Sequence, residues 1–226
     1  MATEHVTGID ITNVTGWLTD RVAVAGQLDF DLVAHGRSNL TFIVTDEAGE
    51  RWVLRRPPTG HVLASAHDMG REHRIISALQ GSEVPVPGLI GFCDDEAVTG
   101  APFYVMEHVA GHILKNLADV DAFSADDRRT MSESLVDTLA ALHRIDPDEV
   151  GLGDLGRKEE YLARQLRRWK RQIDEGSDRP MPLFHELHAA LERAMPPQQG
   201  AGIAHGDYRL DNCMIGADNH VAAVLD

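Results

Sequence analysis

The sequence predicts an α+β fold of two lobes: a small lobe of five antiparallel strands and a larger, mainly helical lobe. Three observations support this prediction. Five short strand-like stretches and one helical pattern lie within residues 28–109, whereas apolar residues at helical spacing recur through residues 111–195. A polar loop and two short apolar runs complete the sequence. Strand patterns followed by helix patterns are typical of α+β folds, so we expect lobes at residues 1–109 and 110–226.

Composition and charge narrow the classes of function. The 226 residues include 36 acidic and 21 basic side chains, a formal net charge of -15. This acidic excess disfavours nucleic-acid binding and adhesion to anionic membranes. No apolar run approaches the roughly 18 residues of a membrane span, and residues 1–14 lack the pattern of a secretory signal. The two cysteines are too few for a disulfide framework, which indicates a reducing cytoplasm.

The small lobe is expected to begin with a helix over residues 10–21, where apolar residues lie at helical spacing. Stretches that alternate or are rich in β-branched residues, bounded by turn residues, indicate strands. The five expected strands are residues 28–33, residues 40–45, a run beginning at Trp52, residues 89–93 and residues 103–109. Short turns join the first three, which predicts an antiparallel meander. A helix is expected over residues 67–80, between the third and fourth strands.

The larger lobe is expected to contain three main helices and a hairpin. Ser124, followed by Asp127 three residues later, resembles a capping box and predicts a helix that continues to about His143. Apolar spacing predicts further helices over residues 158–175 and 184–195. The remaining expected elements are two short strands, at residues 214–215 and 221–225.

The polar loop before this hairpin carries the most informative chemistry. Asp207 and Asn212 are five residues apart, and Asp226 lies fourteen residues beyond Asn212, across the hairpin. Phosphoryl transfer depends on positioning and charge neutralisation, with one carboxylate at the attacking hydroxyl. A second carboxylate and an amide oxygen suit Mg²⁺, which prefers hard oxygen ligands. The spacing therefore favours phosphoryl transfer.

The sequence His205-Gly-Asp-Tyr-Arg-Leu-Asp-Asn212, followed by a strand that ends in Asp, resembles the aminoglycoside phosphotransferase and choline kinase group of the protein-kinase-like fold. With Leu54-Arg-Arg-Pro-Pro, it is most similar to the kinase-like domain of certain acyl-CoA dehydrogenase fusions. The resemblance covers about residues 28–226. It implies that Asp207 is the catalytic base and that Asn212 and Asp226 bind Mg²⁺. Arg209 is either a phosphate-contacting base or an ordinary surface arginine.

The same resemblance implies an ATP site in the small lobe. Arg55 stands where kinases carry a lysine that neutralises the ATP phosphates, and Glu72 would be its partner. Arg56 is the competing choice, but alternation along a strand places it on the opposite face. The turn over the phosphates would contain three cofactor-binding residues, although an ordinary hairpin turn is equally compatible with this stretch. The three expected cofactor-binding residues of this turn are Gly36, Ser38 and Asn39.

The segment between the lobes resembles the kinase hinge. The backbone from Glu107 to Val109 would bind the adenine edge, and Met106 would line the pocket. Met214 would pack beneath the purine. Both methionines are equally compatible with a place in the hydrophobic core.

The sequence therefore predicts an ATP- and Mg²⁺-dependent kinase that acts on the hydroxyl of a small molecule. The alternative is a nucleotide-binding pseudokinase or interaction module, favoured by Arg55 at the lysine position and by the last residue, Asp226, being an expected metal ligand. Similar families build the acceptor site from helices after that aspartate, so we expect a truncated helical lobe and an unidentified acceptor. The arginine-rich helix at 158–175 is either a solvated face or a contact for an anionic substrate.

Overall fold

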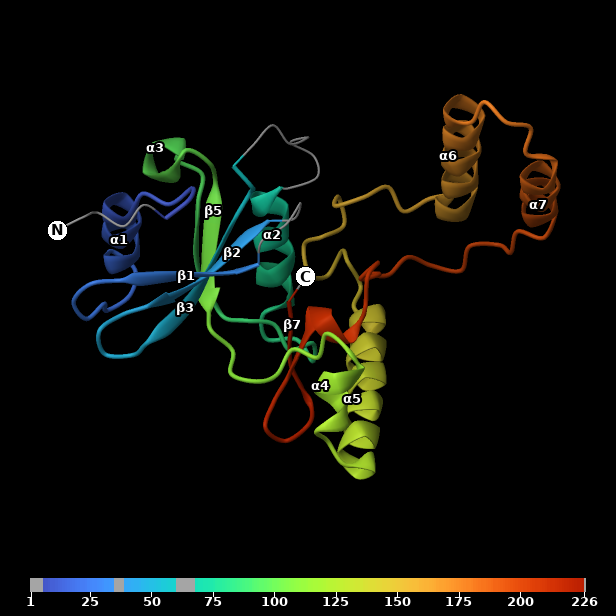
Figure 1. The fold of residues 1–226 in the computed structure, drawn as a ribbon. Coiled ribbons are helices and arrows are strands. Elements are labelled where there is room, and N and C mark those ends of the chain that lie inside the picture. The colour runs from blue at the N-terminus through green and yellow to red at the C-terminus, as the bar shows by residue number, and fades with distance from the viewer. Residues whose placement is uncertain (1–5, 35–38, 60–67, 226) are drawn as a thin grey trace. The chain divides into compact units, whose positions relative to one another are not determined.

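The computed structural model describes residues 6–34, 39–59 and 68–225 (Figure 1). The chain separates into two compact units, one of residues 1–143 with 204–226 and the other of residues 144–203. The lobe boundary expected at residue 109 falls inside the first unit and stays a prediction.

A five-stranded antiparallel sheet is the centre of the first unit, in the order β1-β2-β3-β5-β4. The strands are β1 (Asp29–Ala34), β2 (Leu40–Thr45), β3 (Arg51–Arg56), β4 (Leu89–Cys93) and β5 (Phe103–Glu107). Both the strand number and the meander of the first three strands agree with the sequence-based expectation. The expected end of the fifth strand at residue 109 was wrong by two residues. The chain leaves the sheet after Glu107, and His112 pairs instead with Ile215 near the end of the sequence.

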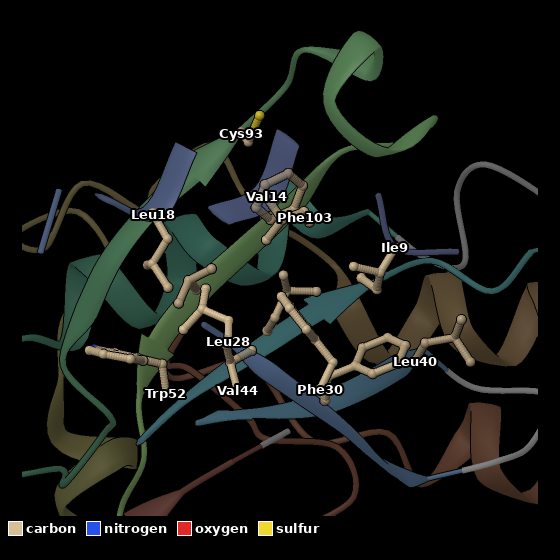
Figure 2. Packing of buried hydrophobic residues seen from close by; sticks show 13 residues of the cluster. Ile9, Val14, Leu18, Leu28, Phe30, Leu40, Val44, Trp52, Cys93 and Phe103 are labelled. Atoms are coloured by element: carbon tan, nitrogen blue, oxygen red, sulfur yellow. The ribbon is translucent and has the colours of Figure 1, made fainter. Parts of the chain in front are cut away.

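The two faces of the sheet pack against different helices. Helix α1 (Ile11–Thr19) covers one face, where Val14 and Leu18 are fully buried. Figure 2 shows this cluster, in which Phe103 of β5 lies close to Val14. Helix α2 (Met69–Leu79) covers the other face with Met69 and Ile76. Residues of β5 alternate between the two clusters, as the pleat of a strand requires.

Capping residues explain where these two helices begin. The Asp10 carboxylate accepts a hydrogen bond from the backbone N–H of Asn13 at 2.9 Å. The Asp68 carboxylate accepts from the N–H of Arg71, also at 2.9 Å. Each interaction satisfies a backbone donor that a helix leaves unpaired in its first turn.

The rest of the first unit surrounds the expected catalytic loop. Its elements are α4 (Leu117–Asp121), α5 (Ala125–Arg144), the short 3₁₀ helix η2 (Leu210–Asn212), β6 (Cys213–Ile215) and β7 (Val221–Val224). The capping box expected for α5 is confirmed, because the Ser124 hydroxyl and the Asp127 carboxylate each bind the backbone N–H of the other residue. A cluster that includes Leu114, Met131 and Ile215 packs beneath the loop.

The second unit contains α6 (Tyr161–Gly176) and α7 (Pro182–Arg193), which contact each other. The buried His188 ring links them, with Nε2 3.2 Å from the carbonyl oxygen of Leu166. Several large apolar side chains of these helices are nevertheless exposed, namely Tyr161, Leu162, Trp169, Leu183, Leu187 and Leu191. In the described part of the chain, no helix is both long and apolar enough to cross a bilayer.

Candidate functional site

The expected catalytic loop, residues 205–212, is held together by a contact between Asp207 and Asn212. The Asn212 amide nitrogen donates to the backbone carbonyl of Asp207 at 2.9 Å and to its carboxylate oxygen Oδ2 at 3.2 Å. The turn of η2 also brings the Asn212 N–H to the carbonyl of Arg209 at 3.0 Å. The loop therefore places the carboxylate and the carboxamide expected for phosphoryl transfer side by side.

Asp207 presents its carboxylate to solvent, with 69% of the side chain exposed. Its backbone N–H donates to Nδ1 of His205 at 3.4 Å, so His205 braces the loop. Arg209 Nη1 lies 4.0 Å from the Asp207 carboxylate, and the Arg209 guanidinium forms a two-pronged ion pair with Asp211. This pairing raises the pKa of Arg209 and lowers the pKa of Asp211, since each charge stabilises the other.

Tyr208 anchors the loop to the helix below it. Its hydroxyl donates to the carbonyl of Leu135 in α5 at 2.9 Å, and its ring contacts that of His205. Burial raises the pKa of Tyr208, so the hydroxyl stays a neutral donor at physiological pH. The Tyr208 side chain thus points toward α5, whereas the charged side chains of Asp207 and Arg209 on either side of it are exposed to solvent.

The hairpin of β6 and β7 brings Leu225 to the expected catalytic loop. The N–H of Leu225 donates to the carbonyl of Asn212 at 2.9 Å, and the N–H of Val224 donates to the carbonyl of Pro85 at 2.9 Å. Asp226, the second expected metal ligand, lies outside the described residues. In the sequence, Asp226 directly follows Leu225, which is hydrogen-bonded to the first expected ligand, Asn212.

The chemistry of Asn212 fits a magnesium ligand. Its amide nitrogen faces Asp207, which turns the carboxamide oxygen toward other partners, and amide and carboxylate oxygens are the hard donors that Mg²⁺ prefers. Among the described residues there is no cluster of three or more His, Cys, Asp or Glu side chains that could hold a metal ion. The expected magnesium site differs from such a cluster, because it consists of the Asn212 amide and the Asp226 carboxylate.

Arg55 joins the sheet to the hairpin. Its Nη1 lies 3.6 Å from the Glu72 carboxylate and donates to the carbonyl of Leu225 at 3.0 Å. Arg56 points the other way and donates to the carbonyls of Pro57 and Thr99. The alternation predicted for the two arginines is confirmed. Burial lowers the pKa of Arg56. Its two carbonyl acceptors satisfy donors of the guanidinium, which allows this arginine to be buried.

Glu72 has two further partners from different elements. Asn39 Nδ2 donates to its Oε1 at 2.6 Å, and the Tyr104 hydroxyl donates to its Oε2 at 3.1 Å. Asn39 therefore reaches the expected partner of Arg55 through its side chain, whereas Gly36 and Ser38 lie outside the described residues. Sequence reasoning missed Tyr104, because a tyrosine within a strand has the pattern of an ordinary core residue.

The expected hinge has distinct buried and exposed parts. Met106 is buried on the α2 side of the sheet, and Glu107 is exposed. The Glu107 N–H donates to the carbonyl of Gly88 at 2.7 Å, which commits this donor to the protein. Val109 is half-buried. Met214 is near the segment that follows, because a Cβ atom at Gly111 would come within 2.8 Å of Met214 Cγ.

Residues 29–226 match the phosphotransferase enzyme family, known as APH. The chain belongs to this family. Over 204 residues, the chain is 36% identical to acyl-CoA dehydrogenase family member 11 of Gallus gallus, covering 89% of this chain and 26% of that protein. It is 34% identical to acyl-CoA dehydrogenase family member 10 of Mus musculus, covering 88% of this chain and 18% of that protein. The chain thus spans about a quarter or less of these relatives.

Solved structures of phosphotransferases share the fold. A Ralstonia eutropha protein, provisionally described as an aminoglycoside phosphotransferase, superposes with a TM-score of 0.82 at 32% identity, covering 96% of this chain and 64% of that one. The streptomycin–ATP complex of APH(2")-IIa has a TM-score of 0.64 at 15% identity, covering 98% and 71%. At that identity the second likeness shows the fold alone. The kinase-like α+β fold expected from the sequence is confirmed.

Proposed function

We propose that this chain is a phosphotransferase that uses ATP and Mg²⁺ to phosphorylate a hydroxyl group of a small molecule. The observation that carries the proposal is the contact between Asp207 and Asn212, at 2.9 and 3.2 Å. It pairs an exposed carboxylate with an oriented carboxamide in a loop that is anchored from beneath. Family membership supports the class of reaction.

Each residue of the loop has a definite chemical task in this proposal. Asp207 orients the acceptor hydroxyl and takes its proton, because its carboxylate is exposed and accepts a hydrogen bond from the Asn212 amide. Arg209, fixed by Asp211, keeps a positive charge near the carboxylate for the transferred phosphoryl group. Asn212 and Asp226 would hold Mg²⁺. When bound, the ion would neutralise charge on the nucleotide phosphates.

Arg55 would contact the nucleotide phosphates from the sheet. A guanidinium can bind phosphate as a planar fork rather than as the point charge of a lysine. Its hydrogen bond to the Leu225 carbonyl supports this role, since it brings the cation to the residue that precedes the expected metal ligand Asp226. Met106, Glu107, Val109 and Met214 would form the purine site, with the Glu107 carbonyl and the Val109 N–H as its backbone contacts.

Experiments must determine which nucleotide donates the phosphoryl group and which small molecule accepts it. Structures of similar fold include a complex with ATP and another with GDP, so ATP and GTP should be compared. The acceptor candidates are aminoglycosides, choline-like alcohols and hydroxyacyl compounds. The last class is suggested by the names of the acyl-CoA dehydrogenase relatives.

We also place the reaction in the cytoplasm. Cys93 and Cys213 are both buried thiols, and burial raises the pKa of each. Thiols of this kind persist in a reducing compartment.

A second candidate, a module that binds nucleotide without transferring phosphate, is favoured by one observation. The cation at the position of the kinase lysine is an arginine already engaged with Glu72 and the Leu225 carbonyl. An enzyme and a binding module differ in whether ADP is formed when an acceptor is present.

The test compares the unchanged chain with Asp207→Asn and with Asp218→Asn, a matched change at an exposed aspartate in the β6–β7 turn. ADP formation is followed with a panel of the three acceptor classes, with Mg²⁺ and with excess chelator. We expect acceptor-dependent, Mg²⁺-dependent turnover that Asp207→Asn lowers about 10²–10⁴-fold and Asp218→Asn leaves unchanged. Equal turnover in Asp207→Asn contradicts the mechanism, whereas nucleotide binding without any ADP formation favours the second candidate.

A further inference from the structure

Glu72 is the meeting point of three side chains that come from three separate places in the sheet. Asn39 precedes β2, Arg55 lies in β3 and Tyr104 lies in β5. Their atoms lie 2.6, 3.6 and 3.1 Å from the Glu72 carboxylate, respectively. All three are buried, with Asn39 8%, Arg55 7% and Tyr104 0% exposed. Such burial is unusual for an asparagine and an arginine, so their positions are tightly defined.

The two oxygens of Glu72 have different partners. Oε1 accepts from Asn39, while Oε2 accepts from Tyr104 and faces Arg55. The distances to Asn39 and Tyr104 are those of hydrogen bonds, and the distance to Arg55 is that of an ion pair. Asn39 and Tyr104 therefore hold the carboxylate on both sides, and the arginine is placed by the carboxylate that they hold.

The placement of Arg55 extends to the hairpin. The same nitrogen that faces Glu72 donates to the Leu225 carbonyl at 3.0 Å. A displacement of Glu72 would draw Arg55 away from this carbonyl or lengthen its ion pair with the carboxylate. The Tyr104 hydroxyl and the Asn39 amide are thus connected to the hairpin through Glu72 and Arg55.

We propose that Tyr104 and Asn39 are positioning residues of the nucleotide site, which act by fixing Glu72 so that Arg55 stays directed between the carboxylate and the hairpin. This inference rests on the proposed function, because it assumes that Arg55 contacts nucleotide phosphates. It gives the Asn39 side chain a role that differs from the backbone contact of a phosphate-binding turn. It also adds Tyr104, which no motif of the sequence indicates.

The experiment measures Mg²⁺–ATP binding by titration calorimetry, which needs no acceptor. Tyr104→Phe removes only a hydroxyl and keeps the buried ring, and Asn39→Ala removes the other donor. Phe103→Leu is the matched control, because Phe103 is the neighbouring residue of β5 and packs on the opposite face of the sheet. Thermal unfolding of each variant records its stability separately. Both positioning changes are then repeated in a Glu72→Gln background.

We expect Tyr104→Phe and Asn39→Ala each to weaken Mg²⁺–ATP binding about tenfold, the magnitude of one hydrogen bond to a charged group. In the Glu72→Gln background, neither should weaken binding further by more than about twofold, since residues that act through one group are not additive. Phe103→Leu should lower the unfolding temperature and leave the affinity unchanged.

Each other outcome overturns the inference in a recognisable way. If the unchanged chain does not bind Mg²⁺–ATP, the proposed function fails and the inference fails with it. If the chain binds and the two variants bind equally well, the inference fails alone. An equal loss with and without Glu72, or the same loss in Phe103→Leu, would show that the variants act through stability or through another group.

Discussion

Replacing Glu72 by Gln tests the central network without changing its shape. The carboxylate accepts from Asn39 and Tyr104 and faces the charge of Arg55. A carboxamide offers one acceptor oxygen and one donor nitrogen, so one of these donors would face another donor. A hydrogen bond to a charged group contributes about 1.5–3 kcal/mol. Breaking a fully buried ion pair costs about 3–5 kcal/mol.

The observed geometry places the loss below that upper range. The Glu72 side chain is 25% exposed and the Arg55 side chain 9%, so water can partly solvate the altered site. We expect the free energy of unfolding to fall by about 2–3 kcal/mol. For a chain of this length, that lowers the unfolding temperature by about 4–12 °C.

The assay must report on the unit that contains the change. Trp17 and Trp52 belong to the first unit, whereas Trp169 belongs to the second. Urea unfolding followed by tryptophan fluorescence in a Trp169→Phe background therefore observes the first unit alone. Glu50→Gln is the control, because Glu50 is an exposed residue between β2 and β3. A Glu72→Gln variant within about 0.5 kcal/mol of its parent, the usual range of a surface change, would refute the reasoning.

Three further predictions concern other parts of the first unit. Backbone N–H groups, first that of Ala25, hold the pKa of Asp46 below its usual value. The ionised Asp46 carboxylate therefore stabilises the fold above the unfolded pKa, and this stabilisation is lost as pH falls through the folded pKa. Asp46→Asn should lower the unfolding temperature at pH 7, and the difference between the variant and the unchanged chain should shrink below about pH 4. A difference that stays constant with pH contradicts this prediction. Ser124→Ala removes the cap of α5 and should cost about 1 kcal/mol in urea unfolding, so an unchanged midpoint would argue against the cap. Gly111→Ala places Cβ 2.4 Å from the Ile215 carbonyl oxygen and should lower stability by about 1–3 kcal/mol, a loss that calorimetry would detect and whose absence would contradict the close packing of the two segments.

Local patterns were sufficient to predict the main elements. Alternation or a richness in β-branched residues identified the five strands, and alternation also placed Arg55 and Arg56 on opposite faces. Helical spacing identified the long helices. The short helices α3 (Glu96–Thr99) and α4 were not predicted, because a helix of about one turn has no periodicity to detect.

Contacts between side chains were less accessible from the sequence. The sequence left Arg209 as either a phosphate contact or a surface arginine, and its ion pair with Asp211 depends on how η2 turns the chain. The hydroxyl of Tyr104 meets Glu72 only once β5 and α2 pack together. Neither the strand pattern nor the helix pattern specifies that meeting. The roles of these residues in binding and transfer stay predictions.

The hydrogen bond from Arg55 to Leu225 also bears on the order in which the protein is synthesised. The two residues are 170 positions apart. At about 5–20 residues per second, a ribosome makes that stretch in roughly 10–30 s. All five strands of the sheet are synthesised before the acceptor of this buried donor exists. The guanidinium of Arg55 therefore cannot complete its native contacts until the end of the hairpin has been synthesised.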